Sequence, residues 1–156
     1  MKSLKIALLS TLAIIMSGCV GTNLNVVQGF AYQASDSFSY EIIDQASVTD
    51  KGMSIFKNQL NTKFQALGLV NGTEPNKVVE ITFTNYYMRH GAARALAGVM
   101  AGADNITTTV IIRDLQTDSV VGQMEVVSKN PTATGSARGL IEGHADKIAM
   151  YIKQGK

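Results

Sequence analysis

Three closely spaced segments in which apolar and polar residues alternate constrain the fold of this chain more than any other feature. They cover residues 79–87, 106–113 and 120–127, and β-branched side chains are frequent among them. Strict alternation is typical of a strand with one face in a core and the other in solvent. We therefore expect three consecutive strands that form an antiparallel meander.

An amphipathic helix is predicted ahead of this meander, over about residues 50–67. Thr49-Asp50 is a good N-cap pair, and the apolar residues that follow are three or four positions apart. Gly68 then stands where a glycine commonly ends a helix.

The remaining segments complete an α+β pattern. Phe38–Ile42 alternates as a strand, and a last helix is predicted from a cap at Thr134 or Ser136 to about Gln154. The order strand, helix, strand, strand, strand, helix predicts an α+β fold with two layers, an antiparallel sheet that carries both helices on one face.

The N-terminus has the layout of an export signal. Lys2 and Lys5 precede an apolar run over residues 6–16, which is too short to span a bilayer. The run ends in Met16-Ser17-Gly18-Cys19, which resembles the lipobox of bacterial lipoproteins. That resemblance implies a diacylglycerol thioether on Cys19, cleavage before it, and acylation of the new amine by a chain such as palmitate. The alternatives are an ordinary secretory signal with a chance cysteine, or a buried helix.

These features divide the chain into three parts. We expect a cleaved signal peptide over 1–18, a lipidated Cys19 with a flexible tether over 19–35, and a single α+β domain over 36–156. An alternative for part of the tether is a short strand around Leu24–Val27. Val20-Gly21 follows the cysteine where an aspartate would favour the inner membrane of enteric-type bacteria. We therefore expect an anchor in the outer membrane and a domain that faces the periplasm.

Charge excludes one class of partner. The chain has 14 Lys and Arg against 12 Asp and Glu, but Lys2 and Lys5 lie in the signal, so the mature part has 12 of each. No basic stretch with interleaved aromatic residues occurs, and we do not expect a nucleic-acid partner.

Residues 89–105 interrupt the strand pattern with glycine and alanine. Gly98 and Gly102 have the spacing of a close helix contact, and Arg94 supplies a charge. One interpretation is a strand crossover packed on the domain. The other is a mobile or partner-binding loop, with Arg94, Gly98 and Gly102 as the candidate interaction residues.

The polar residues of the last helix do not suggest a metal site. Glu142, His144 and Asp146 are two positions apart, so their side chains diverge around the helix. We expect His144 to be a structural residue in a solvated or capping layer. Gly139 and Gly143 suggest a strip where the helix packs closely on its neighbours.

The sequence offers little for catalysis. It has two histidines and one cysteine, which lipidation would consume, and no nucleophile or zinc-hydrolase motif. We therefore expect no enzyme activity, no catalytic residues, no metal and no cofactor.

The mature chain resembles the small bacterial outer-membrane lipoproteins grouped as domains of unknown function. The residues that carry the resemblance are Arg94–Gly98 with Ala101-Gly102, and Thr109–Asp114. The element order is also similar to the N-terminal domain of TolB and to lipoproteins that assist curli secretion or activate peptidoglycan synthases. This resemblance implies a binding or assembly role in the cell envelope.

We therefore expect a lipid-anchored, non-enzymatic binding or assembly module whose partner is another envelope protein or a second copy of itself. Exposed strand edges would offer such a partner a place to pair. The alternatives are a module that binds a small ligand or a lipid between sheet and helices, an envelope enzyme, or an exclusion lipoprotein of a mobile element.

Overall fold

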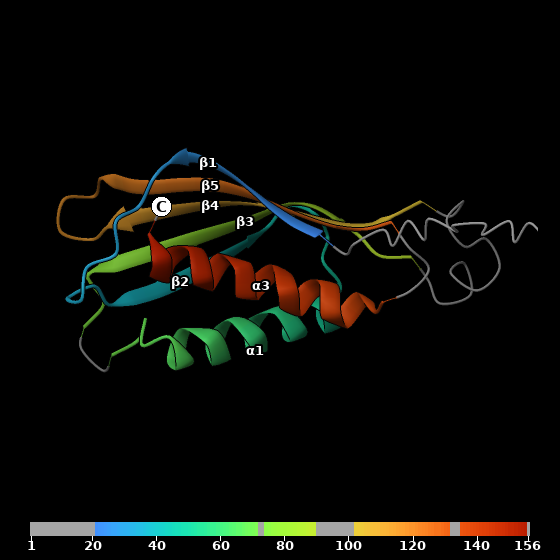
Figure 1. Ribbon diagram of the computed structural model, residues 1–156, viewed down its shortest axis with the longest axis horizontal. Helices are drawn as coiled ribbons and strands as arrows, with labels where there is room; N and C mark the ends of the chain where they lie inside the picture. The colour runs from blue at the N-terminus through green and yellow to red at the C-terminus, as the bar shows by residue number, and fades with distance from the viewer. Residues whose placement is uncertain (1–20, 72–73, 90–101, 132–134, 156) are drawn as a thin grey trace, which may run out of the picture.

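The computed structural model describes residues 21–71, 74–89, 102–131 and 135–155. A five-stranded sheet forms one layer, and α1 and α3 lie side by side on one of its faces (Figure 1). This confirms the α+β fold with two layers. The elements are β1 (Gly21–Gln28), β2 (Phe38–Asp44), α1 (Asp50–Ala66), β3 (Lys77–Tyr87), β4 (Asp104–Asp114), β5 (Val120–Asn130) and α3 (Ala137–Gln154).

The strand order is β1-β5-β4-β3-β2. β3, β4 and β5 pair antiparallel in sequence order, which confirms the meander. β2 pairs with β3 in parallel, so the sheet is mixed at this edge rather than antiparallel throughout. The cause is α1, which returns the chain to the end where β2 began, so that β3 runs in the same direction.

β1 corrects the flexible tether expected over 19–35, and it is longer than the short strand considered around Leu24–Val27. Residues Gly21–Val26 and Gln28 pair antiparallel with β5, with a register shift at Val27. The Thr22 and Ser128 hydroxyls lie 2.7 Å apart across this pair, and Phe30 beyond the strand is buried in the core. Glycine and asparagine led to the interpretation as a tether, although Thr22, Leu24 and Val26 alternate with the asparagines as strand residues do.

Both helices begin and end at the residues that capping rules predict. Thr49 Oγ1 accepts a hydrogen bond from the Gly52 N–H at 3.1 Å, and Ser136 Oγ accepts one from the Gly139 N–H at 3.0 Å. Gly68 follows α1 with a φ of +62°, a conformation in which glycine has no steric penalty.

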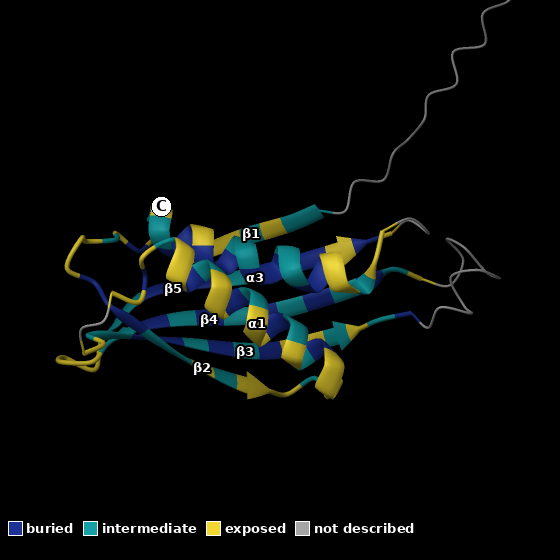
Figure 2. Cartoon of the chain, turned by 90° about the horizontal axis from the view of Figure 1, so that it is seen from below, coloured by how far each residue is buried: buried dark blue, intermediate teal, exposed yellow. Residues whose placement is uncertain are grey.

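The core lies between the sheet and the helices, and Figure 2 shows buried residues in both layers. The close packing inferred at Gly143 is wrong, because a Cβ there would meet no atom within 4 Å outside its own stretch of helix. The largest fully buried side chains are Phe38, Phe56, Phe64, Phe83, Leu60, Leu69, Ile81, Ile106, Ile112, Met124, Ile148 and Ile152.

One end of the domain brings together the start of β1 and the first turns of both helices (Figure 1). Register places Gly21 beside Lys129, Lys129 beside Asn105, and Asn105 beside Tyr87, so these residues form one row across the sheet. We call the end of the domain that contains this row the proximal end. The hairpin that joins β4 to β5 lies at the opposite, distal end. None of the described helices is long and apolar enough to cross a membrane.

Candidate functional site

Of the residues predicted to carry the lipid or to contact a partner, the structure places only Gly102. Cys19, Arg94 and Gly98 lie outside the described residues, so their roles stay predictions. Gly102 is exposed and has a φ of +82°. A Cβ at this position would meet no described atom within 4 Å, so backbone conformation accounts for the glycine.

A buried ion pair joins the two strands that residues 90–101 connect. Arg89 Nε lies 3.2 Å from Asp104 Oδ1, and neither side chain is exposed to solvent. The Arg89 backbone N–H donates to the same oxygen at 2.8 Å, and the guanidinium donates to the Asn130 carbonyl at 3.0 Å. These bonds satisfy charges that would be costly to bury alone, and they fix the ends of β3, β4 and β5 to one another.

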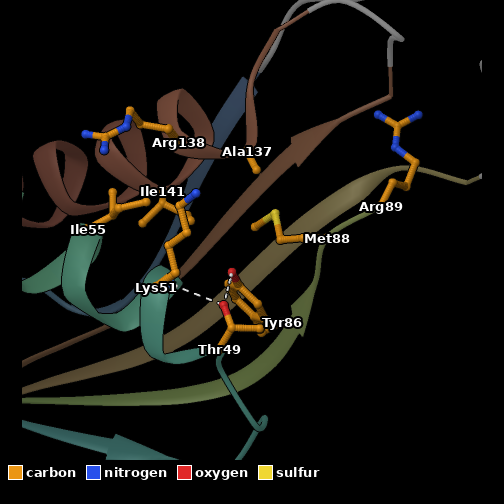
Figure 3. Close-up of a pocket in the computed structure, with 10 residues that line it drawn as sticks. Thr49, Lys51, Ile55, Tyr86, Met88, Arg89, Ala137, Arg138 and Ile141 are labelled. Carbon is orange, nitrogen blue, oxygen red and sulfur yellow. Dashed lines mark hydrogen bonds between the residues drawn. The ribbon is translucent and has the colours of Figure 1, made fainter. Parts of the chain in front are cut away.

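A cleft of about 340 Å³ opens at the proximal end, between the first turns of α1 and α3 and the end of β3 (Figure 3). Tyr86 and Met88 line the side formed by β3, and Ile55 and Ile141 line the side formed by the helices. A Cβ at Gly52 would overlap the Tyr86 hydroxyl group, so a larger residue there would displace the Tyr86 side chain.

Two exposed cations from different helices stand at this cleft. Lys51 comes from the first turn of α1, and Arg138 from the first turn of α3. Arg138 forms an exposed ion pair with Glu142 at 3.1 Å, which adds little stability. The cleft therefore combines apolar walls with positive charge, a composition suited to an amphipathic anion.

His144 occupies the core rather than the solvated layer expected for it. Its Nδ1 lies 2.7 Å from Ser128 Oγ, and its Nε2 lies 2.9 Å from Thr108 Oγ1. Burial lowers the pKa of His144 to about 3, so the ring is neutral at pH 7. A histidine with no exposed surface, bonded to two hydroxyl groups, ties α3 to β4 and β5 and is closed to any substrate.

The other charged residues of α3 point to separate partners, as their spacing predicted. Asp146 pairs with Lys63 at 3.2 Å and accepts a hydrogen bond from Gln59, which joins α3 to α1. Glu142 pairs with Arg138 on the same helix. Among the described residues, no group of His, Cys, Asp and Glu could hold a metal ion.

The two outermost strands, β1 and β2, differ in how their free edges are protected. β1 has eight residues, none of them charged and none a proline, whereas β2 contains Glu41 and Asp44. Natural edge strands are usually blocked by charge, proline or a covering segment. Val26 and Val27 of β1 are 42% and 65% exposed, so this edge is open and partly apolar.

A shallow groove of about 280 Å³ runs beside β1. Leu24, Val26, Met150 and Tyr151 supply its apolar lining, with Lys147 and Gln154 from α3 at its margin. The open strand edge and this groove together form the surface that we call the β1 surface.

Comparison with known proteins identifies the family. The family described as "Domain of unknown function (DUF4410)" matches residues 34–135. This chain belongs to that family. The matched region begins just before β2 and ends before α3, so β1 and α3 are parts of this DUF4410 protein outside the match. No curated protein matches the chain.

Two solved structures of PelC from Paraburkholderia phytofirmans have a similar fold. One is a dodecamer of a point variant, with a TM-score of 0.64 and 12% identity, covering 85% of this chain and 98% of PelC. The other is also a dodecamer, with a TM-score of 0.59 and 13% identity, covering 85% and 99%. At this identity the likeness shows a shared fold.

Proposed function

We propose that this DUF4410 protein is a lipid-anchored envelope protein that acts without catalysis, by assembling with further copies of itself. The lipobox at Cys19 supports the anchor, and the residues after it favour an outer-membrane location with the domain in the periplasm. We favour self-assembly over a general binding role, because the β1 surface is suited to a second copy of the chain.

The observation that carries self-assembly is the open β1 edge. A second strand could extend the sheet there through backbone hydrogen bonds, and the apolar side chains of the β1 surface would be covered. The dodecamers formed by the structurally similar PelC proteins support a second copy as the occupant.

Strand directions permit one simple repeat. β1 is antiparallel to β5, and β2 is parallel to β3, so β1 and β2 run in opposite directions. The β1 edge of one copy can therefore pair antiparallel with the β2 edge of the next, with all helices on the same face. Ile43 of β2 is exposed and would be covered in that pairing. Such head-to-tail contacts leave no free edge when the ring closes.

The test is a double substitution on the β1 edge. Val26→Lys/Val27→Lys places two charges where a second strand would pair, and both positions are exposed enough to leave the folded monomer intact. Val70→Lys/Leu115→Lys is the matched control, because these residues are 49% and 48% exposed but lie outside β1 and β2.

Native mass spectrometry of the detergent-extracted full protein measures the outcome. We expect a multimer for the unmodified protein and for the control, and smaller species for the β1 variant. A monomeric unmodified protein, or a multimer that the β1 variant leaves intact, contradicts the proposal. Circular dichroism confirms that both variants are folded.

The cleft of Figure 3 favours a second candidate, a module that binds an amphipathic anion. Its volume is at the lower end of the range for ligand sites, and Lys51 and Arg138 supply the positive charge. Decyl phosphate is a suitable probe. A rise in melting temperature that Lys51→Gln/Arg138→Gln abolishes would support this candidate, and no rise with the unmodified protein would exclude this probe class.

A further inference from the structure

We propose that the proximal end of the domain rests on the lipid headgroups of the membrane that holds Cys19, with Tyr87 and Lys129 in contact with them. This inference rests on the proposed lipidation of Cys19. It goes beyond an anchor, because it states which end of the domain faces the bilayer and how closely.

The distance between the anchor and the sheet carries the inference. Gly21 is already paired with Lys129 in the sheet, and only Val20 separates Gly21 from Cys19. Two residue steps span at most about 7 Å. A lipid on Cys19 therefore holds the start of β1 at the membrane surface. The segment between Cys19 and Gly21 is too short to let the distal end turn toward the bilayer.

The strands then run away from the membrane. Figure 1 shows the start of β1 at the same end as the first turns of α1 and α3, with the hairpin between β4 and β5 at the other end. β4 has 11 residues, which at about 3.3 Å each place that hairpin on the order of 35 Å from the bilayer.

The side chains beside Gly21 suit a lipid surface. Tyr87 is 49% exposed although it is a large aromatic residue, and tyrosine is enriched where membranes meet water. Lys129 is exposed in the same row and can contact lipid phosphate groups. Asp104 carries the nearest carboxylate in β4, and the buried pair with Arg89 keeps it from facing the phosphates.

The proposal is tested by measuring how near chosen positions are to the lipid. Lipidation consumes the thiol of Cys19, the single cysteine of the chain, so an introduced cysteine would be the only free thiol. Lys129→Cys places a fluorophore at the proximal end. Thr117→Cys, in the turn between β4 and β5, is the matched control at the distal end.

The full protein is produced in a lipidating bacterium, labelled, and reconstituted in phosphatidylcholine vesicles that contain brominated lipid. We expect bromine to quench at least half of the fluorescence at position 129 and almost none at position 117. In the labelled Lys129→Cys protein, the additional substitution Tyr87→Ser should reduce the quenching at position 129, because the domain would lose its interfacial aromatic side chain.

Palmitate labelling of the same preparations separates the two ways of failing. If Cys19 incorporates palmitate but positions 129 and 117 are quenched equally, the anchor stands and the proposed orientation is wrong. If no palmitate is incorporated, the anchor itself is refuted and the orientation with it. Quenching confined to position 117 would mean that the distal end contacts the membrane.

Discussion

Lowering the pH should destabilise this domain through one residue, His144. The ring has no exposed surface, and its hydrogen bonds go to the hydroxyl groups of Ser128 and Thr108. Burial lowers its pKa to about 3, against an ordinary value near 6.5. The unfolded chain therefore binds a proton that the folded chain excludes.

The sign and size of the effect follow from these two pKa values. Because the folded-state pKa is the lower one, the stability contributed by the neutral ring is complete above pH about 6.5 and is lost as the pH falls toward 3. Between pH 7.5 and pH 5 the loss is about 2 kcal/mol, and each further unit of acid costs about 1.4 kcal/mol. A hydrogen bond from Lys77 lowers the pKa of Asp114 to about 2. Protonation of that carboxylate therefore affects the stability of the fold only at lower pH.

Urea unfolding followed by circular dichroism at pH 7.5 and pH 5 measures the loss. His144→Gln keeps a polar side chain but removes the titration, so we expect its stability to fall by about 2 kcal/mol less than that of the unmodified protein over this interval. Ser128→Ala weakens the same network and keeps the ring, so its pH dependence should match the unmodified protein. Equal pH dependence in all three proteins would refute the assignment of the effect to His144.

Four further substitutions test the roles of two glycines and of the buried ion pair. Gly122→Ala should destabilise the fold by about 1–3 kcal/mol, because its Cβ would lie 2.8 Å from the Phe30 Cβ. Gly143→Ala should stabilise α3 by about 0.5–1 kcal/mol, because its Cβ would meet no atom within 4 Å outside its own stretch of helix. Chemical denaturation measures both changes in the free energy of unfolding. Arg89→Met should cost about 3–5 kcal/mol because it leaves Asp104 charged and buried, and adding Asp104→Asn should recover much of this loss in a double-mutant cycle.

Periodicity was sufficient to predict the centre of this fold. Strands β3, β4 and β5 alternate because each has one face on the core, and α1 has apolar residues three and four positions apart. The parallel pairing of β2 with β3 was also within reach, because a strand, a helix and a strand in succession favour a parallel crossover.

The edge strand was harder to predict. β1 pairs on one side only, so its polar residues remain exposed and its composition is close to that of a linker. Its alternation of Thr22, Leu24 and Val26 with asparagine suggested a short strand around Leu24–Val27, but Gly21 and the asparagines favoured a tether over the longer strand.

The polar contacts of the core could not be predicted from sequence, because they join residues that are distant along the chain. His144 meets Thr108 across 36 positions, and Arg89 meets Asp104 across 15. Helical spacing correctly separated His144 from Glu142 and Asp146. It could not show that His144 faces two hydroxyl groups, because that depends on how α3 lies across the sheet.

The proposed membrane contact and the proposed self-association constrain each other, because both would involve β1. If β1 paired with a second β1 about a two-fold axis, the two Gly21 residues would stand at opposite ends of an eight-residue antiparallel pair, about 27 Å apart. Each lipid anchor is joined to its Gly21 by a segment of at most about 7 Å, so the two anchors could not then reach one flat bilayer. Pairing of β1 with the β2 edge of the next copy keeps every copy upright and every Cys19 on one face. The proposed lipidation at Cys19 would thus favour the head-to-tail contact over the two-fold one.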